Sequence, residues 1–164
     1  MRLVMTICLV LILPICLLAG GDVSPRFTRD VDGVITDSST NLQWREGPDQ
    51  AMNWNQAQAW ISGLGDGWGT PTQVQLKGIY LENATRMGGR DSTGVGPYPL
   101  KLDPVFQLDK AYWVWAESKD SSSAWIFAFN EGEELWNYRD KSTWLHRAFA
   151  VRSREDGKAG KGGG

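Results

Sequence analysis

The chain has few residues that carry sulfur or imidazole chemistry. It contains two cysteines, Cys8 and Cys16, and one histidine, His146. Both cysteines fall within the first 21 residues, so the remainder has no thiol for nucleophilic catalysis, a redox pair or a cysteine metal site. A single histidine without identifiable partners supports neither a histidine metal cluster nor a Ser-His-Asp triad. We interpret His146 as a polar residue at a strand edge.

The chain also lacks a basic excess. Its formal net charge is −2, and no basic stripe alternates with aromatic residues. This composition argues against nucleic-acid binding.

A long apolar run is found only at the start of the chain. Arg2 precedes the run, and Ala19 and Gly21 follow it as small residues. The pattern predicts a signal peptide at residues 1–21 and a periplasmic or extracellular protein with no membrane span after cleavage. Retention of the segment as an uncleaved anchor is left open. We expect one domain at 22–154 and a disordered Gly/Lys tail at 155–164.

Tryptophan is abundant. All nine tryptophans lie after residue 43, in the part predicted to fold. Such a density indicates a compact aromatic core, a surface that stacks on carbohydrate, or both.

The first elements are predicted to be a hairpin and a short strand. Asp32-Gly33 lies between two short apolar runs, which is typical of a tight hairpin turn. The stretch "DSSTN" at 37–41 favours a second turn, because its side chains bond their own backbone. In "LQW", Leu42 and Trp44 would share one face of a strand and face a core.

Two helices are predicted next. Residues 53–65 have helical spacing, with Asn53 as the N-cap and Gly65 at the end. In the second helix, Thr72 and Gln75 form a capping box.

The rest of the chain reads as a loop followed by strands. Residues 83–110 are rich in glycine and proline without a period, which predicts a long irregular loop suited to ligand contact. Strands are expected at 112–118, on both sides of a turn at 130–132, and at 146–154. The fold class is therefore α+β, with two helices packed on an antiparallel sheet.

Several motifs, taken in order, resemble the Lcl C-terminal domain family, which is named for a bacterial collagen-like adhesin. The opening motif matches at Asp32, Gly33, Thr36, Asp37, Thr40, Leu42 and Trp44, and a second motif matches at Trp68, Pro71, Thr72 and Leu76. The resemblance covers about residues 26–154. It implies a C-type-lectin-like fold whose opening hairpin pairs near the closing strand.

The chain departs from this family at defined positions. Members often carry two cysteines, for which the resemblance implies a bridge, at the positions of Ile61 and Ala150, and here we expect an apolar contact instead. An Arg and a Glu of the middle motif are replaced by Gly69 and Gln75. The calcium-binding signatures of sugar-binding C-type lectins are absent, and whether calcium binds is left open.

Candidate ligand-binding residues cluster near the predicted turns. An exposed aromatic ring beside polar side chains can stack on a sugar and hydrogen-bond its hydroxyl groups. The alternative is that these aromatic residues cap the core of the sheet. The candidate residues are Trp136, Asn137, Tyr138, Arg139 and Trp144, together with Arg90 and Tyr98 from the loop.

An acidic cluster near the same turn has two interpretations. Glu131, Glu133, Glu134 and Asp140 could ligate calcium or supply a carboxylate pair for glycoside hydrolysis. We expect a solvated acidic hairpin instead, and predict no metal, no cofactor and no catalytic residue.

The sequence therefore predicts an exported, non-enzymatic module that binds a glycan or a protein at the bacterial cell envelope. A structural subunit of an envelope or surface assembly is the alternative, and a carboxylate hydrolase ranks last. The oligomeric state is left open.

Overall fold

The computed structural model describes residues 25–84, 86–89, 96–108, 111–141 and 146–154. The predicted signal peptide and tail lie outside the described residues, as do Arg90 and Trp144. No helix in these described ranges is both long enough and apolar enough to cross a membrane.

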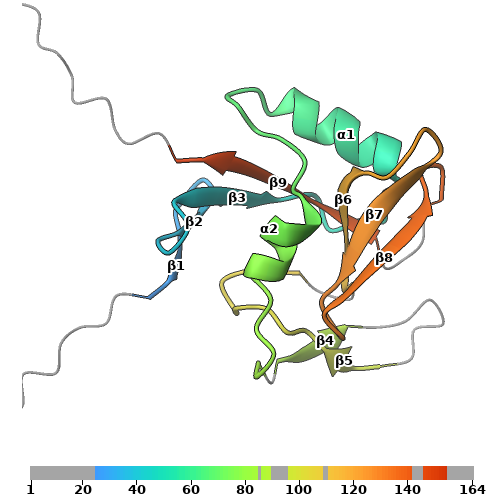
Figure 1. Cartoon of the computed structure of the whole chain (residues 1–164). Helices are drawn as coiled ribbons and strands as arrows, with labels where there is room; N and C mark the ends of the chain where they lie inside the picture. The colour runs from blue at the N-terminus through green and yellow to red at the C-terminus, as the bar shows by residue number, and fades with distance from the viewer. Residues whose placement is uncertain (1–24, 85, 90–95, 109–110, 142–145, 155–164) are drawn as a thin grey trace, which may run out of the picture.

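The fold is α+β, as predicted, and is dominated by one seven-stranded sheet in the order β1-β2-β3-β9-β6-β7-β8 (Figure 1). The strands are β1 (Phe27–Arg29), β2 (Ile35–Asp37), β3 (Leu42–Glu46), β6 (Trp113–Ser118), β7 (Ser123–Ala128), β8 (Glu133–Tyr138) and β9 (His146–Ser153).

The expectation of a purely antiparallel sheet is wrong, because β6 and β9 are parallel, with Trp113 opposite His146 and Trp115 opposite Ala148. β9 therefore runs in the same direction as β6, although it is antiparallel to its other neighbour, β3. The sheet is therefore mixed.

The longest strand, β9, joins two halves of the sheet. Its first half pairs with β6, and its second half pairs antiparallel with β3, where Trp44 lies opposite Val151. Of the N-terminal strands, β3 pairs with the closing strand, and the opening hairpin of β1 and β2 continues the sheet next to β3.

The predicted hairpin at the start is confirmed. β1 and β2 pair antiparallel, and Gly33 in the turn has φ +80°, which glycine adopts without steric cost. The carboxylate of Asp30 accepts hydrogen bonds from the backbone N–H groups of Asp32 and Val34, which fixes the turn.

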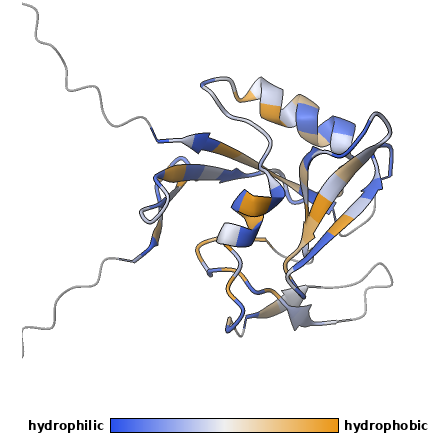
Figure 2. Cartoon of the chain, in the orientation of Figure 1, coloured by the Kyte–Doolittle hydropathy of each residue, from blue (hydrophilic) through white to orange (hydrophobic). Residues whose placement is uncertain are grey.

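Both predicted helices are present with their predicted caps. α1 spans Trp54–Gly63 and α2 spans Gln73–Gly78, and Asn53 and Thr72 cap them through capping boxes with Gln56 and Gln75. Hydrophobic and hydrophilic residues alternate around α1 in Figure 2, in keeping with a helix that lies on the sheet.

Two apolar clusters form the core. In β7, Phe127 belongs to the larger cluster, which includes residues of α2, whereas Ala124 and Ile126 belong to the smaller one, which includes residues of α1. The predicted alternation of β7 is confirmed, because successive side chains of a strand point to opposite faces.

The tryptophans divide between core and surface. Among the described ones, Trp44 and Trp115 are buried and Trp136 is exposed. The rest are partly buried: Trp54, Trp60, Trp68, Trp113 and Trp125.

The segment at 83–110 is less irregular than expected. It contains β4 (Met87–Gly89) and β5 (Tyr98–Pro99), which pair as a small separate sheet. The side chains of Leu100, Leu102 and Phe106 are fully buried in the larger cluster. Much of this segment is therefore core, because its spaced apolar residues are buried although the glycines and prolines around them break regular structure.

The interpretation of His146 as a strand-edge residue is wrong. β9 is an interior strand, and His146 is fully buried with its ring stacked 4.5 Å from Trp115. Burial, and then the charge of Arg147, lower the pKa of His146 to about 4. At neutral pH the imidazole is consequently an uncharged core ring.

Ile61 and Ala150, where an apolar contact was expected, are both buried. α1 packs against β9, the two elements that carry these residues.

Candidate functional site

The outer edge of the sheet carries an exposed aromatic pair. Trp136 and Tyr138 on β8 are each 51% exposed, and their ring centroids lie 5.7 Å apart in an edge-to-face arrangement. Their two-residue spacing on a strand places both rings on one face. β8 is the last strand of the sheet (Figure 1), so no strand of the described residues pairs with its outer side.

A third aromatic residue extends this pair inward. Trp125 on β7 lies directly opposite Trp136 in the β7–β8 register and is partly buried against the larger cluster. The ammonium of Lys119 lies 5.2 Å from the Trp136 ring and 5.6 Å from the Trp125 ring. We call Trp125, Trp136 and Tyr138 the β8 aromatic strip.

A polar hollow of about 510 Å³ lies at the end of the strip. Tyr138 lines both features, so a ligand stacked on the strip would reach hydroxyl, amide and charged groups in the hollow. The hollow is lined by Asn55, Ser121, Ser122, Tyr138, Arg139, Asp140 and Lys141.

Arg139 is held by the protein. Its Nε donates to the carbonyl of Ser123 (3.3 Å), its Nη2 donates to Ser118 Oγ and the carbonyl of Asp120, and its guanidinium lies 4.2 Å from the Trp54 ring. Arg139 therefore positions the turn between β6 and β7 at the edge of the hollow.

The same turn is organised by a carboxylate. Asp120 accepts hydrogen bonds from the hydroxyl and backbone N–H groups of Ser123 and Ser122. These bonds, led by that from the Ser123 side chain, hold the pKa of Asp120 well below its usual range. The turn that presents Ser121 and Ser122 to the hollow is therefore fixed by its own hydrogen bonds.

The structure separates some of the predicted site residues. Trp136, Tyr138 and Arg139 lie together around the strip and the hollow. Asn137 points to the opposite face of β8, because the strand alternates. Tyr98 lies on β5, partly buried against the larger cluster, and its ring centroid is 5.8 Å from that of Tyr112. Arg90 and Trp144 lie outside the described residues.

The acidic residues of the β7–β8 hairpin do not form a metal-ligand group. Within the described ranges, no three histidine, cysteine or acidic side chains are grouped to hold a metal ion. Glu133 and Glu134 are exposed, and Glu134 pairs with Lys77 of α2 at 3.4 Å.

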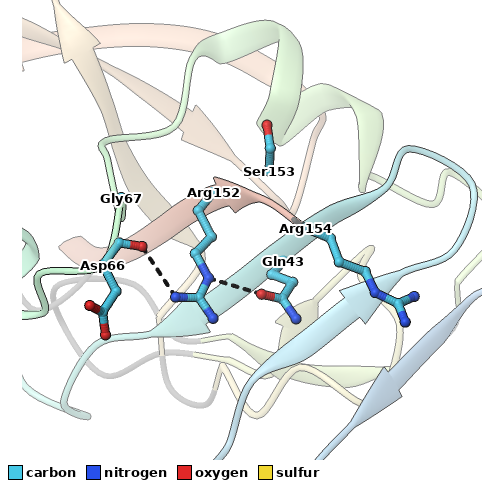
Figure 3. A pocket seen from close by; sticks show the side chains of 6 residues that line it. All are labelled: Gln43, Asp66, Gly67, Arg152, Ser153 and Arg154. Carbon is cyan, nitrogen blue, oxygen red and sulfur yellow. Dashed lines mark hydrogen bonds between the residues drawn. The ribbon is translucent and has the colours of Figure 1, made fainter. Parts of the chain in front are cut away.

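A second polar region was not predicted from the sequence. A hollow of about 700 Å³ is formed where the ends of β3 and β9 meet the turn after α1 (Figure 3). The available signal was the Arg152-Ser153-Arg154 run, which brings two guanidinium groups to the end of β9. The hollow is lined by Gln43, Asp66, Gly67, Arg152, Ser153 and Arg154.

Comparison with known proteins adds no relative, since no protein-family model matches the chain and no curated protein sequence matches it. The resemblance to Lcl C-terminal domains therefore stays a prediction.

Proposed function

We propose that this protein is an exported, non-enzymatic binding module that recognises a glycan or a protein ligand at the bacterial cell envelope through the β8 aromatic strip. The observation that carries the proposal is the pair of half-exposed rings, Trp136 and Tyr138, on an open sheet edge beside a polar hollow. Adjacent exposed apolar side chains that form a contiguous patch are a feature of interaction sites.

The chemistry of the strip suits a sugar ring. The apolar face of a pyranose stacks on an indole or a phenol, while its hydroxyl groups need hydrogen-bonding partners nearby. Asn55, Ser122 and Asp140 in the hollow supply an amide, a hydroxyl and a carboxylate. The arrangement thus provides both requirements within one continuous surface.

Two further expectations belong to this proposal. The likeness to Lcl C-terminal domains implies a C-type-lectin-like fold and an adhesin-like role. The apolar N-terminal segment implies export to the periplasm or the exterior.

A glycan array followed by calorimetry tests the proposal. Trp136→Ala and Tyr138→Ala should each weaken binding of the selected ligand about five- to tenfold, because a stacked ring contributes on the order of 1 kcal/mol. Val31→Ala is the matched control, since Val31 is fully exposed in the first hairpin, away from the strip. If both variants bind the ligand identified on the array as tightly as the wild type does, the strip is not the binding site.

A structural subunit is the second candidate, favoured by the same open edge. An edge strand with exposed apolar side chains is a template for pairing with another chain. Light scattering on the purified protein separates the candidates. A stable oligomer that Trp136→Lys dissociates would favour assembly, whereas a monomer would favour ligand recognition.

A further inference from the structure

The outer strand β8 turns part of its backbone away from the sheet. The backbone N–H of Arg139 donates to the carbonyl of Ser122 (2.9 Å), one residue beyond the last pair of the β7–β8 ladder. In an antiparallel ladder, residues that bond the neighbouring strand alternate with residues whose N–H and C=O groups point away from it. Counting back from Arg139, the residues of β8 whose backbone groups point away from β7 are Glu134, Trp136 and Tyr138.

The outward backbone groups differ in their local partners. The N–H of Tyr138 donates to the side-chain oxygen of Asn137 (2.9 Å), and its carbonyl accepts from the N–H of Lys141 (3.1 Å). Among the described residues, the outward groups of Glu134 and Trp136 have no such partner. A donor and an acceptor left open at the edge of a sheet are a template for another strand.

This edge lacks several of the features by which proteins protect an edge strand. β8 has six residues, contains neither proline nor glycine, and pairs with β7 without a bulge. At the opposite edge of the sheet, β1 has only three residues (Figure 1). Short strands, prolines and bulges discourage pairing between edges. Of the two edges, β8 is therefore the one suited to pair with another strand.

A second copy of β8 fits this edge in one antiparallel register. Outward-facing residues must meet outward-facing residues, so with Trp136 on a two-fold axis each Trp136 N–H donates to the carbonyl of the other, and Glu134 lies opposite Tyr138 of the other copy. Moving the axis by one residue would place Tyr138 opposite Gly132, which has φ +81° in the hairpin turn, or Glu134 opposite Asp140, a carboxylate. Larger shifts leave fewer residues paired.

The side chains are compatible with this register. Glu133 lies opposite Arg139 of the other copy, and between these positions no like charges lie opposite each other. Trp136 lies opposite Trp125 within one chain and opposite Trp136 of the other copy across the axis, so the indoles form one row on the same face. An unrelated strand would match this pattern only by coincidence, whereas β8 itself does so by symmetry.

From this self-complementary edge we propose that two copies of the chain pair through β8, antiparallel and with Trp136 on the two-fold axis, to form one continuous sheet. The partner copy contributes its own aromatic strip, so the two strips join into a single row. Because the strands pair edge to edge, the ring faces stay open to a ligand. The inference goes beyond the proposed function and does not depend on it.

This dimer differs from a structural assembly in two respects. The same edge is used by both copies, so the pairing is isologous and closes at two chains. One strand from each chain makes a small contact, and small interfaces are characteristic of weak complexes. The dimer should therefore dissociate on dilution, whereas a structural subunit would stay assembled.

Sedimentation velocity over a concentration series tests the pairing. The purified protein should show a reversible monomer–dimer equilibrium without larger species. Glu134→Pro removes an outward N–H that bonds no described residue of the monomer, and proline is tolerated at such a position of an edge strand. This variant should keep the wild-type circular dichroism spectrum and lose the dimer.

The matched control is Glu134→Ala, which loses the same carboxylate but keeps the N–H and should retain the dimer. Both variants keep Trp136 and Tyr138, so binding of a ligand to the strip should be unchanged in each. Failure of the dimer is thus distinguishable from failure of the proposed function. A monomer at every concentration, growth beyond two chains, or a dimer that survives in Glu134→Pro would overturn the proposal.

Two lysine substitutions test the register and do not rely on proline. Trp136→Lys places a lysine opposite its own copy across the axis and should weaken dimerisation about tenfold. Tyr138→Lys replaces another exposed ring of β8 but places the lysine opposite Glu134 of the other copy, so it should retain or strengthen the dimer. Equal weakening by the two substitutions would overturn the register and with it the proposal.

Discussion

Arg26 donates two parallel hydrogen bonds to the carboxylate of Asp37, from Nε to Oδ1 at 2.9 Å and from Nη2 to Oδ2 at 2.7 Å. The same carboxylate accepts from the hydroxyl groups of Ser39 and Thr40. Arg26 Nη2 also donates to the carbonyl of Gly78 at the end of α2. The hydroxyl-rich stretch after β2 therefore satisfies a buried carboxylate and ties the first hairpin to a helix.

Removal of this arginine should destabilise the fold. Burial alone raises the pKa of Asp37, but the hydrogen bonds from Arg26, Ser39 and Thr40 outweigh it and lower the pKa to about 2. Arg26→Met leaves the buried carboxylate without its cation and should cost about 2 kcal/mol of unfolding free energy, measured by urea denaturation at pH 7. The hydroxyl donors that remain limit the loss.

The control for this substitution is Lys77→Met, which breaks the exposed pair with Glu134 and should change stability by less than about 0.5 kcal/mol. The wild-type contribution of Asp37 is present above pH 3.8 and is lost as the pH falls towards 2. Equal destabilisation by Arg26→Met at pH 7 and at pH 2 would show that charge is not the cause.

His146 should make the protein less stable in mild acid. Its pKa is about 4 in the folded state and 6.5 in the unfolded chain, so between these values the unfolded state binds the extra proton. Stability should fall by about 3 kcal/mol as the pH drops from 6.5 to 4. His146→Phe keeps a ring against Trp115 and should remove this component. The difference between the urea midpoints of the wild type and the variant, followed from pH 6.5 to pH 4, measures this contribution of His146. A difference that does not change with pH would refute the prediction.

Gly132 should not tolerate a side chain. It has φ +81°, and a Cβ atom there would lie 2.6 Å from Cζ of Tyr80, whose ring packs on Phe127. Gly132→Ala should therefore cost about 2 kcal/mol, from the strained backbone and the displaced ring. Gly63→Ala at the end of α1 meets no atom within 4 Å and should leave thermal stability unchanged or slightly raised.

Acrylamide quenching should identify Trp136 as a major source of accessible fluorescence. Among the described tryptophans it is the exposed one, whereas Trp44 and Trp115 are buried. Trp136→Phe should reduce the quenchable fraction while thermal stability changes little, because the side chain is half in water. Trp115→Phe should instead destabilise the fold, since the indole N–H that bonds the Met52 carbonyl at 2.8 Å is lost. An unchanged quenchable fraction in Trp136→Phe would contradict the exposed position of this ring.

The sequence by itself determined the local elements. The Asp32-Gly33 turn and the Asn53 and Thr72 caps depend on residues at most three positions apart, so local pattern was sufficient to predict them. The alternation along β7 similarly predicted which side chains face each cluster.

Only the tertiary structure decided which distant residues meet. The parallel pairing of β9 with β6 buried His146, and the pairing of β7 with β8 placed Trp125 opposite Trp136. The hollow in Figure 3 likewise joins residues from β3, β9 and the turn after α1, more than a hundred positions apart at its extremes. Such contacts are set by the order and register of the strands. Strand order and register depend on how the whole chain packs, so no short stretch of sequence specifies them.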